Sequence, residues 1–165
     1  MFEFFHWLQS MRFATYLRES GLTYPIIMST HLTGMGLFGG LILMTDLRLL
    51  GLVMRGSTIT EVVTQFRVWK RVGIVVVAGC GILLWWCKAE QYSINPFFWT
   101  KIVLLTLVIV HARVFRKSVY HNTEELDRAP EVPGHAKWAA ALSLLLWVGL
   151  VSAGRLIGYY EPPQQ

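Results

Sequence analysis

A histidine flanked by two methionines is the most chemically distinctive feature of the sequence. Met28, His31 and Met35 are three and four residues apart, so they share one face of an α-helix. Thioether sulfur and imidazole nitrogen are good ligands for copper, above all Cu(I), and a His–Met pair also ligates haem iron. These three residues are therefore a candidate metal site. The alternative is a neutral His31 bonded to a neighbouring helix, with the methionines as packing residues.

The remaining histidines and one arginine suggest a second kind of site, for haem b. His111 ends an apolar run, and His121 and His135 stand in the basic segment that follows. Histidines can hold haem b when they face each other at one depth, and Arg155 is suited to pair with a propionate. At 1.5 Å per residue, we expect His31 and His111 to differ in depth by about 10–15 Å. That difference in depth argues against a single haem bound between His31 and His111. For His121 and His135, the alternative to a ligand role is that they are hydrated side chains of a loop.

Motifs of soluble enzymes are missing from the sequence. It contains no Walker A loop, no GxGxxG ahead of a predicted helix, and no HExxH, CxxC or CxxCH. The last absence argues against a covalently attached c-type haem but leaves haem b open. We therefore do not expect the chain to be an enzyme on its own.

Four apolar runs must position the candidate residues. The chain is 54% hydrophobic and 15% charged, whereas a soluble domain carries about a quarter charged residues. A helix needs roughly 20 apolar residues to cross a bilayer, and the runs do not alternate as β-barrel strands do. We predict a single all-α membrane domain over residues 1–165, a bundle of four transmembrane helices with spans at about 23–47, 71–88, 97–115 and 137–160.

Three segments outside the spans also have readable patterns. Residues 1–20 have an apolar and a polar face, which predicts an interfacial helix. Thr58 and Glu61 have the spacing of a capping box, which predicts a short cytoplasmic amphipathic helix before the second span. Residues 124–134 (EELDRAPEVPG) are acidic and contain two prolines, so we expect an irregular, exposed loop.

The charge distribution predicts the orientation in the membrane. Ten of the fifteen basic residues fall in the two segments that follow the first and third spans. The positive-inside rule then places these segments in the cytoplasm and both termini in the periplasm of a bacterial inner (plasma) membrane. Because the first long apolar run begins near residue 24, we expect no cleaved signal peptide. The basic segments also carry acidic residues. We therefore expect the basic residues to lie beside a lipid bilayer and not to bind nucleic acid.

Charged residues and glycines near the span ends have structural interpretations. Asp46 and Arg48 stand where the first span meets the cytoplasm, and we expect them to anchor the helix or to pair with a neighbour. Gly36 and Gly40 are four residues apart, as are Gly154 and Gly158 in the fourth span. Such spacing lets helix backbones approach closely, either inside the bundle or between subunits of a homo- or hetero-oligomer.

Three stretches of the sequence carry a family resemblance. They are HLTGMGLFGGLILMTDLRLLG (31–51), NPFFWTKIVLL (95–105) and SLLLWVGLVSAGRLIGYY (143–160). They resemble an uncharacterised bacterial family of four-helix membrane proteins, domain of unknown function 6644, over nearly the whole chain. The family's recognisable positions then fall on His31, Asp46, Arg48, Asn95, Lys101, Trp147 and Arg155. Asparagine is usual where this sequence has His111, so the resemblance implies no general ligand role there.

The resemblance implies an architecture without an established activity. That architecture is broadly similar to the CopD-like copper-transport membrane domains, although fold alone does not fix function. Our leading hypothesis is a module that binds or passes copper through His31, Met28 and Met35, with a periplasmic metal-carrying protein as its partner. The alternatives are a b-type cytochrome subunit that passes electrons between a periplasmic carrier and quinone, and a structural anchor for a larger complex.

Overall fold

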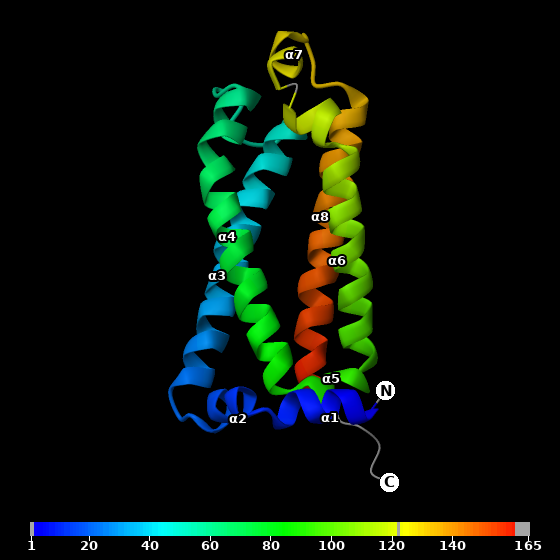
Figure 1. Ribbon diagram of the computed structural model, residues 1–165. Helices are drawn as coiled ribbons and strands as arrows, with labels where there is room; N and C mark the ends of the chain where they lie inside the picture. The colour runs from blue at the N-terminus through cyan, green and yellow to red at the C-terminus, as the bar shows by residue number, and fades with distance from the viewer. Residues whose placement is uncertain (1, 122, 161–165) are drawn as a thin grey trace.

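The computed structural model describes residues 2–121 and 123–160, and every regular element in them is helical. Four helices are long and apolar enough to cross a membrane, and they run side by side along the molecule (Figure 1). They are α3 (Thr23–Leu49), α4 (Ile59–Cys87), α6 (Pro96–Val114) and α8 (Gly134–Leu156), the last continued by a 3-10 turn, η2 (Ile157–Tyr159). The predicted all-α, four-span architecture is confirmed.

Local sequence signals set where two of these helices begin. α6 begins at Pro96, and the Asn95 side chain accepts hydrogen bonds from two backbone amides of the first turn at 3.0 and 3.4 Å. α4 begins with the predicted capping box, in which Thr58 and Glu61 each accept a bond from the other's amide. The amphipathic segment expected before the second span is helical, but it is continuous with that span rather than a separate helix.

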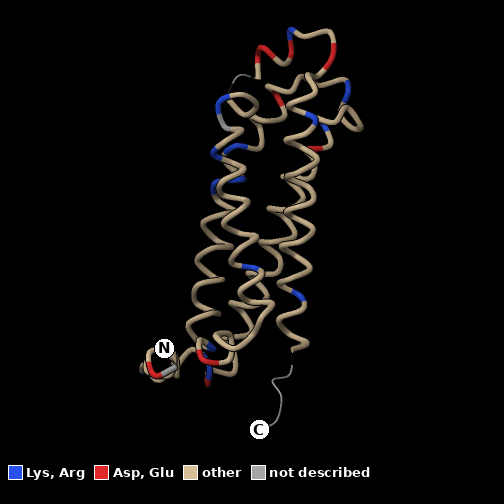
Figure 2. The backbone as a smooth tube through the Cα atoms, turned by 90° about the vertical axis from the view of Figure 1, so that its right-hand side faces the viewer, with Lys and Arg blue, Asp and Glu red and all other residues tan. Residues whose placement is uncertain are grey.

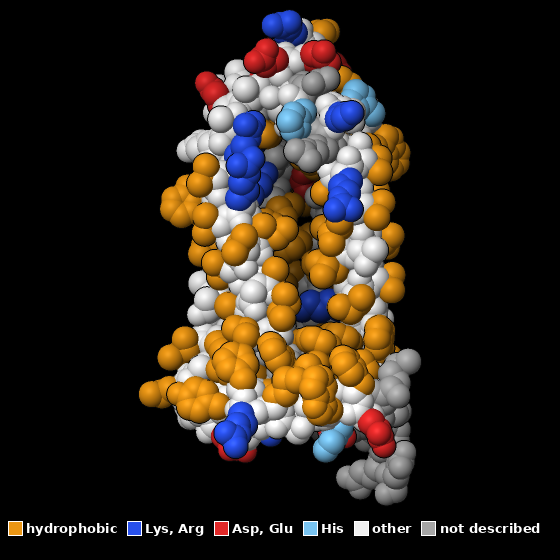
Figure 3. Space-filling view, viewed as in Figure 1, with side chains coloured by type: hydrophobic (Ala, Val, Ile, Leu, Met, Phe, Trp, Pro, Cys, Tyr) orange, Lys and Arg blue, Asp and Glu red, His pale blue; other side chains and the backbone are white. Residues whose placement is uncertain are grey.

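The four long helices form two closely packed pairs. α3 packs along α4, α6 packs along α8, and contacts between α3 and α8 join the pairs. α4 and α6 are scarcely in contact, so the bundle is open on that side. The space-filling view shows a hollow between the pairs, with basic side chains on both sides of its upper end (Figure 3).

Apolar side chains cover the outside of the spans. Leu37, Val75, Val103 and Leu145 are 70%, 71%, 59% and 71% exposed, one on each long helix. Charged residues gather at the two ends of the bundle, and few interrupt its middle (Figure 2). A monomeric soluble protein rarely exposes so much contiguous apolar surface, whereas lipid covers it without cost.

Three short helices cover the end of the bundle that carries both termini, called here the terminal end (Figure 1). They are α1 (Phe2–Ser10), α2 (Arg12–Glu19) and α5 (Ala89–Ser93). The Trp86 indole Nε1 donates to the carbonyl of Leu8 at 3.0 Å, and the Glu90 amide donates to the Gln9 side chain at 3.1 Å. The predicted interfacial helix therefore forms as two helices that break at Met11 and lie across the ends of the spans.

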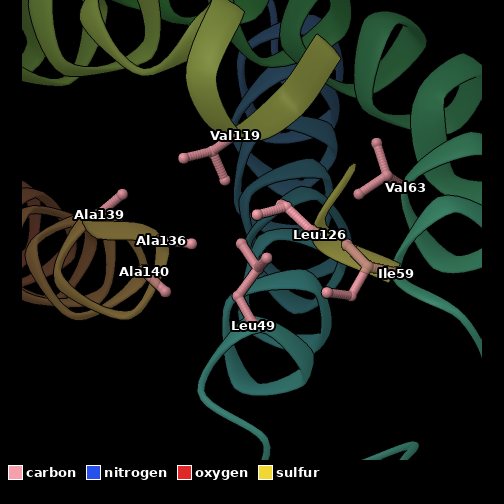
Figure 4. Packing of buried hydrophobic residues seen from close by; sticks show 8 residues of the cluster. All are labelled: Leu49, Ile59, Val63, Val119, Leu126, Ala136, Ala139 and Ala140. Atoms are coloured by element: carbon pink, nitrogen blue, oxygen red, sulfur yellow. The ribbon is translucent and has the colours of Figure 1, made fainter. Parts of the chain in front are cut away.

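The opposite end, called here the loop end, is more ordered than the sequence suggested. Between α6 and α8 lie a π-helix, η1 (Arg116–His121), and α7 (Thr123–Arg128), so the expectation of an irregular loop is wrong over α7. The reason is that Leu126 is only 5% exposed and belongs to a buried apolar cluster at this end (Figure 4). The cluster consists of Leu49, Ile59, Val63, Val119, Leu126, Ala136, Ala139 and Ala140.

Candidate functional site

His31 is buried between α3 and α4 in a fixed orientation. Its side chain is among the buried polar groups, and Nδ1 lies 3.0 Å from the backbone carbonyl of Val77. A carbonyl only accepts hydrogen bonds, so Nδ1 must carry the proton and donate. In the neutral ring, Nε2 then keeps its lone pair. The imidazole thus has one nitrogen tied to α4 and one nitrogen able to accept a hydrogen bond or bind a metal.

A glycine on α4 makes room for this imidazole. A Cβ added at Gly81 would lie 3.1 Å from Cε1 and 3.7 Å from Nδ1 of His31. The same addition at Gly79, half a turn away, would meet nothing within 4 Å. The missing side chain at Gly81 therefore lets the His31 ring lie against the α4 backbone and reach Val77.

The two methionines of the predicted site lie on the same helix as His31. Met28 and Met35 are both half-buried, about one turn to either side of it along α3. The structure therefore places one imidazole and two thioethers on one stretch of α3, as the spacing predicted. Whether they bind a metal together stays a prediction.

Lys101 lies inside the membrane-spanning part of α6 and influences His31. Its Nζ would be 3.2 Å from a Cβ added at Gly154 of α8, so the ammonium rests against the bare backbone of the neighbouring helix. Its charge acts on the imidazole of His31, which places the two groups in one electrostatic environment. Sequence reasoning named Lys101 only as a family position and as one of the basic residues outside the two basic segments. The available signal was a lysine in the apolar string FFWTKIVLL, because charged groups within a span are costly and mark functional sites.

The other candidate histidines lie apart from His31. His111 is buried on α6, and its Nε2 donates to the carbonyl of Ala139 on α8 at 3.0 Å, so it belongs to the other helix pair. His121 and His135 are exposed at the loop end. Over residues 2–121 and 123–160, no group of three or more His, Cys, Asp or Glu side chains is placed to hold a metal ion.

Arg155 is exposed on α8 near the terminal end. Its guanidinium donates to the Tyr159 hydroxyl at 3.1 Å and lies 5.2 Å from the centre of that ring. Asn95 fastens the same end, since its Nδ2 donates to the carbonyl of Ile157 at 3.1 Å. Through these contacts Arg155 and Asn95 both bind residues of η2 and stabilise the end of α8.

A polar cluster is buried at the loop end, around the last turn of α3. Asp46 is 1% exposed, and the groups that interact with it are Lys70 from α4, Tyr120 from η1 and Ser143 from α8. Burial, followed by the nearby Asp46 charge, raises the pKa of Tyr120 above its ordinary value. Sequence reasoning counted Lys70 only among the basic residues between the first two spans. The helical pattern that begins at Ile59 and runs into the second span was the signal that it lies on a helix.

Arg48 and Asp127 form a separate contact region at the loop end. Arg48 donates from Nε to the Ser57 carbonyl at 2.9 Å. Asp127 accepts from the amides of Ile59 and Thr60 at 2.6 and 3.0 Å and so caps α4 from another segment. Burial alone would raise the pKa of Asp127, but bonds from Thr60 and Ile59 and the charge of Arg48 hold it below its ordinary value.

A cavity of about 680 Å³ opens beside this region. Its charged lining residues have both signs: Arg48, Arg55, Asp127, Glu131 and Lys137. Both oxygens of Asp127 are used on α4, and neither His31 nor Asp46 lines the cavity. The cavity therefore forms part of the loop-end surface rather than of the intramembrane polar groups.

Comparison with known proteins gives a family but no activity. A family model described as a family of unknown function (DUF6644) matches residues 4–160. No curated protein and no solved structure matches the chain.

Proposed function

The chain belongs to the DUF6644 family of unknown function, so its activity has to be inferred from its own residues, and we propose that it binds Cu(I) within the membrane through His31, with Met28 and Met35 as further ligands. The observation that carries the proposal is the orientation of His31. Metal-binding histidines typically donate their second ring N–H to a carboxylate or backbone carbonyl, which fixes the tautomer. The Nδ1–Val77 bond is such a contact and leaves Nε2 for the metal.

The choice of Cu(I) follows from the ligand types. Thioethers are soft ligands that select Cu(I), whereas harder divalent ions prefer carboxylate and carbonyl oxygen. Met28 and Met35 offer sulfur one turn to either side of the imidazole on α3. A site made of neutral ligands also suits a singly charged ion inside a membrane.

The proposed setting is a bacterial inner membrane with both termini in the periplasm. The support is the excess of basic residues at the loop end, which the positive-inside rule assigns to the cytoplasm. His31 lies in the half of α3 nearer the terminal end, so the site would face the periplasmic side. A periplasmic copper-carrying protein is then the proposed partner.

The decisive experiment measures Cu(I) stoichiometry and affinity of the purified full-length chain in detergent. Anaerobic competition with a colorimetric Cu(I) chelator is suitable, with His111→Ala as the matched buried-histidine control. We expect one Cu(I) per chain in the wild type and in His111→Ala, and loss of binding in His31→Ala. An unchanged number of Cu(I) ions per chain in His31→Ala would contradict the proposal.

A pair of glycine variants tests the role of the His31 orientation. Gly81→Val places a branched side chain where the imidazole lies, whereas Gly79→Val enters open space on the same helix. We expect Gly81→Val to weaken Cu(I) binding at least tenfold, about 1.4 kcal/mol, and Gly79→Val to leave it unchanged. Equal affinities in the two variants would mean that the contact with Val77 does not matter for binding.

The haem alternative has less geometric support. A bis-histidine haem needs two ligands at one depth, and His31 and His111 are tied to different helix pairs, through Val77 and Ala139. A dithionite-reduced minus air-oxidised absorbance spectrum of protein expressed with haem supplied tests it directly. A sharp reduced α band would favour the cytochrome, and a featureless spectrum would remove the haem hypothesis and leave the copper site and the structural anchor.

A structural anchor is the second candidate, and the open glycine face of α3 favours it. A Cβ added at Gly36 or at Gly40 would meet nothing within 4 Å, so this pair is free for a partner helix. Gly154, by contrast, faces Lys101 inside the chain. Cross-linking in native membranes should therefore lose an oligomer in Gly36→Leu. An oligomer that survives in Gly36→Leu would count against the anchor.

A further inference from the structure

Asp46 has an unusual environment for a carboxylate. It lies in the last turn of α3, it is 1% exposed, and its Oδ2 has no hydrogen-bond partner among the described residues. The groups that face it are Lys70 from α4, Tyr120 from η1 and the uncharged Ser143 from α8. A buried polar atom without a partner is rare in proteins and calls for a specific explanation.

Lys70 is close to Asp46 but is bound elsewhere. Its Nζ donates to Thr45 Oγ1 at 2.5 Å, and that hydroxyl donates to the carbonyl of Leu41 at 2.8 Å. Lys70 and Asp46 interact electrostatically, yet they are not among the ion pairs within 4.0 Å in the described part of the chain. The ammonium of the half-buried Lys70 and the buried carboxyl group thus lie in one polar cluster without direct contact.

Burial opposes the ionised form of Asp46, whereas the hydroxyls of Ser143 and Tyr120 and the charge of Lys70 stabilise it. An ionised carboxylate is very costly to bury unless it is paired, whereas the neutral acid is far less so. If the ammonium turned from Thr45 to Asp46, it would supply the missing partner and stabilise the ionised form. A lysine side chain has a flexible four-carbon stem, so such a movement needs no change of the backbone.

We propose that Asp46 and Lys70 form a proton-exchange site at the loop end, in which Lys70 Nζ moves between Thr45 Oγ1 and Asp46 Oδ2. When Lys70 is on Thr45, Asp46 holds the proton. When Lys70 reaches Asp46, the O–H bond of the acid breaks, its electron pair stays on the carboxylate, and the proton passes to water at the loop end. Uptake is the reverse. This inference does not depend on the copper site.

Infrared spectroscopy of the full-length protein in lipid tests the proposal. We expect a protonated-carboxyl C=O band that shifts in D2O, decreases as the pH rises, and is missing in Asp46→Asn. Asp127→Asn is the matched control, because Asp127 is ionised at the surface of the same end, and it should keep the band. A spectrum without a band due to Asp46, or with one that does not change with pH, would overturn the proposal.

Two further variants test the movement of Lys70, and they serve also if Asp46→Asn fails to fold. Lys70→Met removes the partner of the ionised form, so the band should persist to higher pH by about one unit or more. Thr45→Val removes the competing acceptor, so Lys70 should favour Asp46 and the band should disappear at lower pH. Shifts in the same direction in both variants, or no shift in either, would contradict the exchange of Lys70 between two acceptors.

Discussion

At the scale of single residues, the two half-buried lysines Lys70 and Lys101 differ in what surrounds them. Lys70 has a hydroxyl acceptor in Thr45 and an acid in Asp46. Lys101 rests against the backbone at Gly154, and its charge acts on the imidazole of His31. A positive charge near a proposed cation site opposes binding, and in a membrane the opposition is weakly screened. Lys101 would therefore limit how tightly His31 holds a metal.

Removal of the Lys101 charge should strengthen the proposed site. We expect Lys101→Met, which keeps the length of the side chain, to raise Cu(I) affinity by about tenfold, since one nearby charge is worth about 1–2 kcal/mol at an effective dielectric constant near 20. Chelator competition measures the change, and Arg155→Met is the control, because that charge is held at Tyr159 in η2, which continues its helix. A lower affinity in Lys101→Met would indicate that the lysine supports the ligand, as it would for an anion.

Asp127 gives a prediction outside the membrane. Because its pKa is lowered in the folded protein, its stabilising effect is present above the unfolded value of about 3.9 and is lost as the pH falls through the folded value. We expect Asp127→Ala to lower the free energy of unfolding by about 1 kcal/mol at neutral pH, as the loss of an N-terminal helix cap does. Thermal midpoints in detergent should differ between wild type and variant at pH 7, and this difference should shrink as the pH falls below about 4 and through the lowered pKa of Asp127. A difference that persists at low pH would contradict the capping role.

At the scale of elements, small residues decide how closely the helices approach. Gly39 is buried where α3 meets α8, and a Cβ added there would lie 2.6 Å from two carbons of the Trp147 indole. The same indole packs edge-on against Phe38, with ring centres 5.5 Å apart. The contact joins the two helix pairs, since α3 and α8 form the interface between them.

A matched pair of glycine variants tests this contact. Gly39→Ala forces the Trp147 ring or the helices to move, and we expect it to destabilise the bundle by about 1–3 kcal/mol. Gly36→Ala, on the same helix, meets nothing within 4 Å and should be neutral or slightly stabilising, because alanine favours helix. The two substitutions change helix propensity equally, so the difference in thermal midpoint isolates the contact. Equal midpoints would mean that Trp147 moves aside at little cost.

At the scale of the whole molecule, the bundle has one open side and two different ends. In a closed four-helix bundle each long helix would contact two neighbours. Here α3 contacts α4 and α8, and α6 contacts α8, but α4 and α6 are scarcely in contact. The terminal end is covered by α1, α2 and α5, whereas the loop end carries most of the basic residues. Such asymmetry of charge gives a polytopic protein a single orientation in the bilayer.

The orientation itself can be measured with reporter fusions. We expect alkaline phosphatase fused to the C-terminus to be active, because this enzyme folds only in the periplasm, and green fluorescent protein fused there to remain dark. Fusions in the loop between α3 and α4 should behave in the opposite way. The reverse pattern would place His31 nearer the cytoplasmic side and would exclude a periplasmic copper donor.

Much of the fold could be predicted from the sequence, because its determinants are local. Apolar runs of the right length predicted four spans, and Thr58 with Glu61 predicted a helix start that is the start of α4 in the structure. Helical spacing also placed Met28, His31 and Met35 on one face of one helix. Each of these inferences depends only on residues within a few turns of one another, because capping bonds and side-chain contacts at helical spacing act between such near neighbours in the sequence.

The tertiary structure alone decided which polar groups meet. Lys101 reaches Gly154, Lys70 reaches Thr45, and Tyr120 joins Asp46. The partners in each pair are at least 25 residues apart, so no local period relates them. In a bilayer, apolar helix faces do not determine which helices pack together, because lipid is as apolar as a neighbouring helix. Helix pairing therefore depends on close contacts such as Gly39 with Trp147 and Gly81 with His31, which exist only once the bundle is assembled.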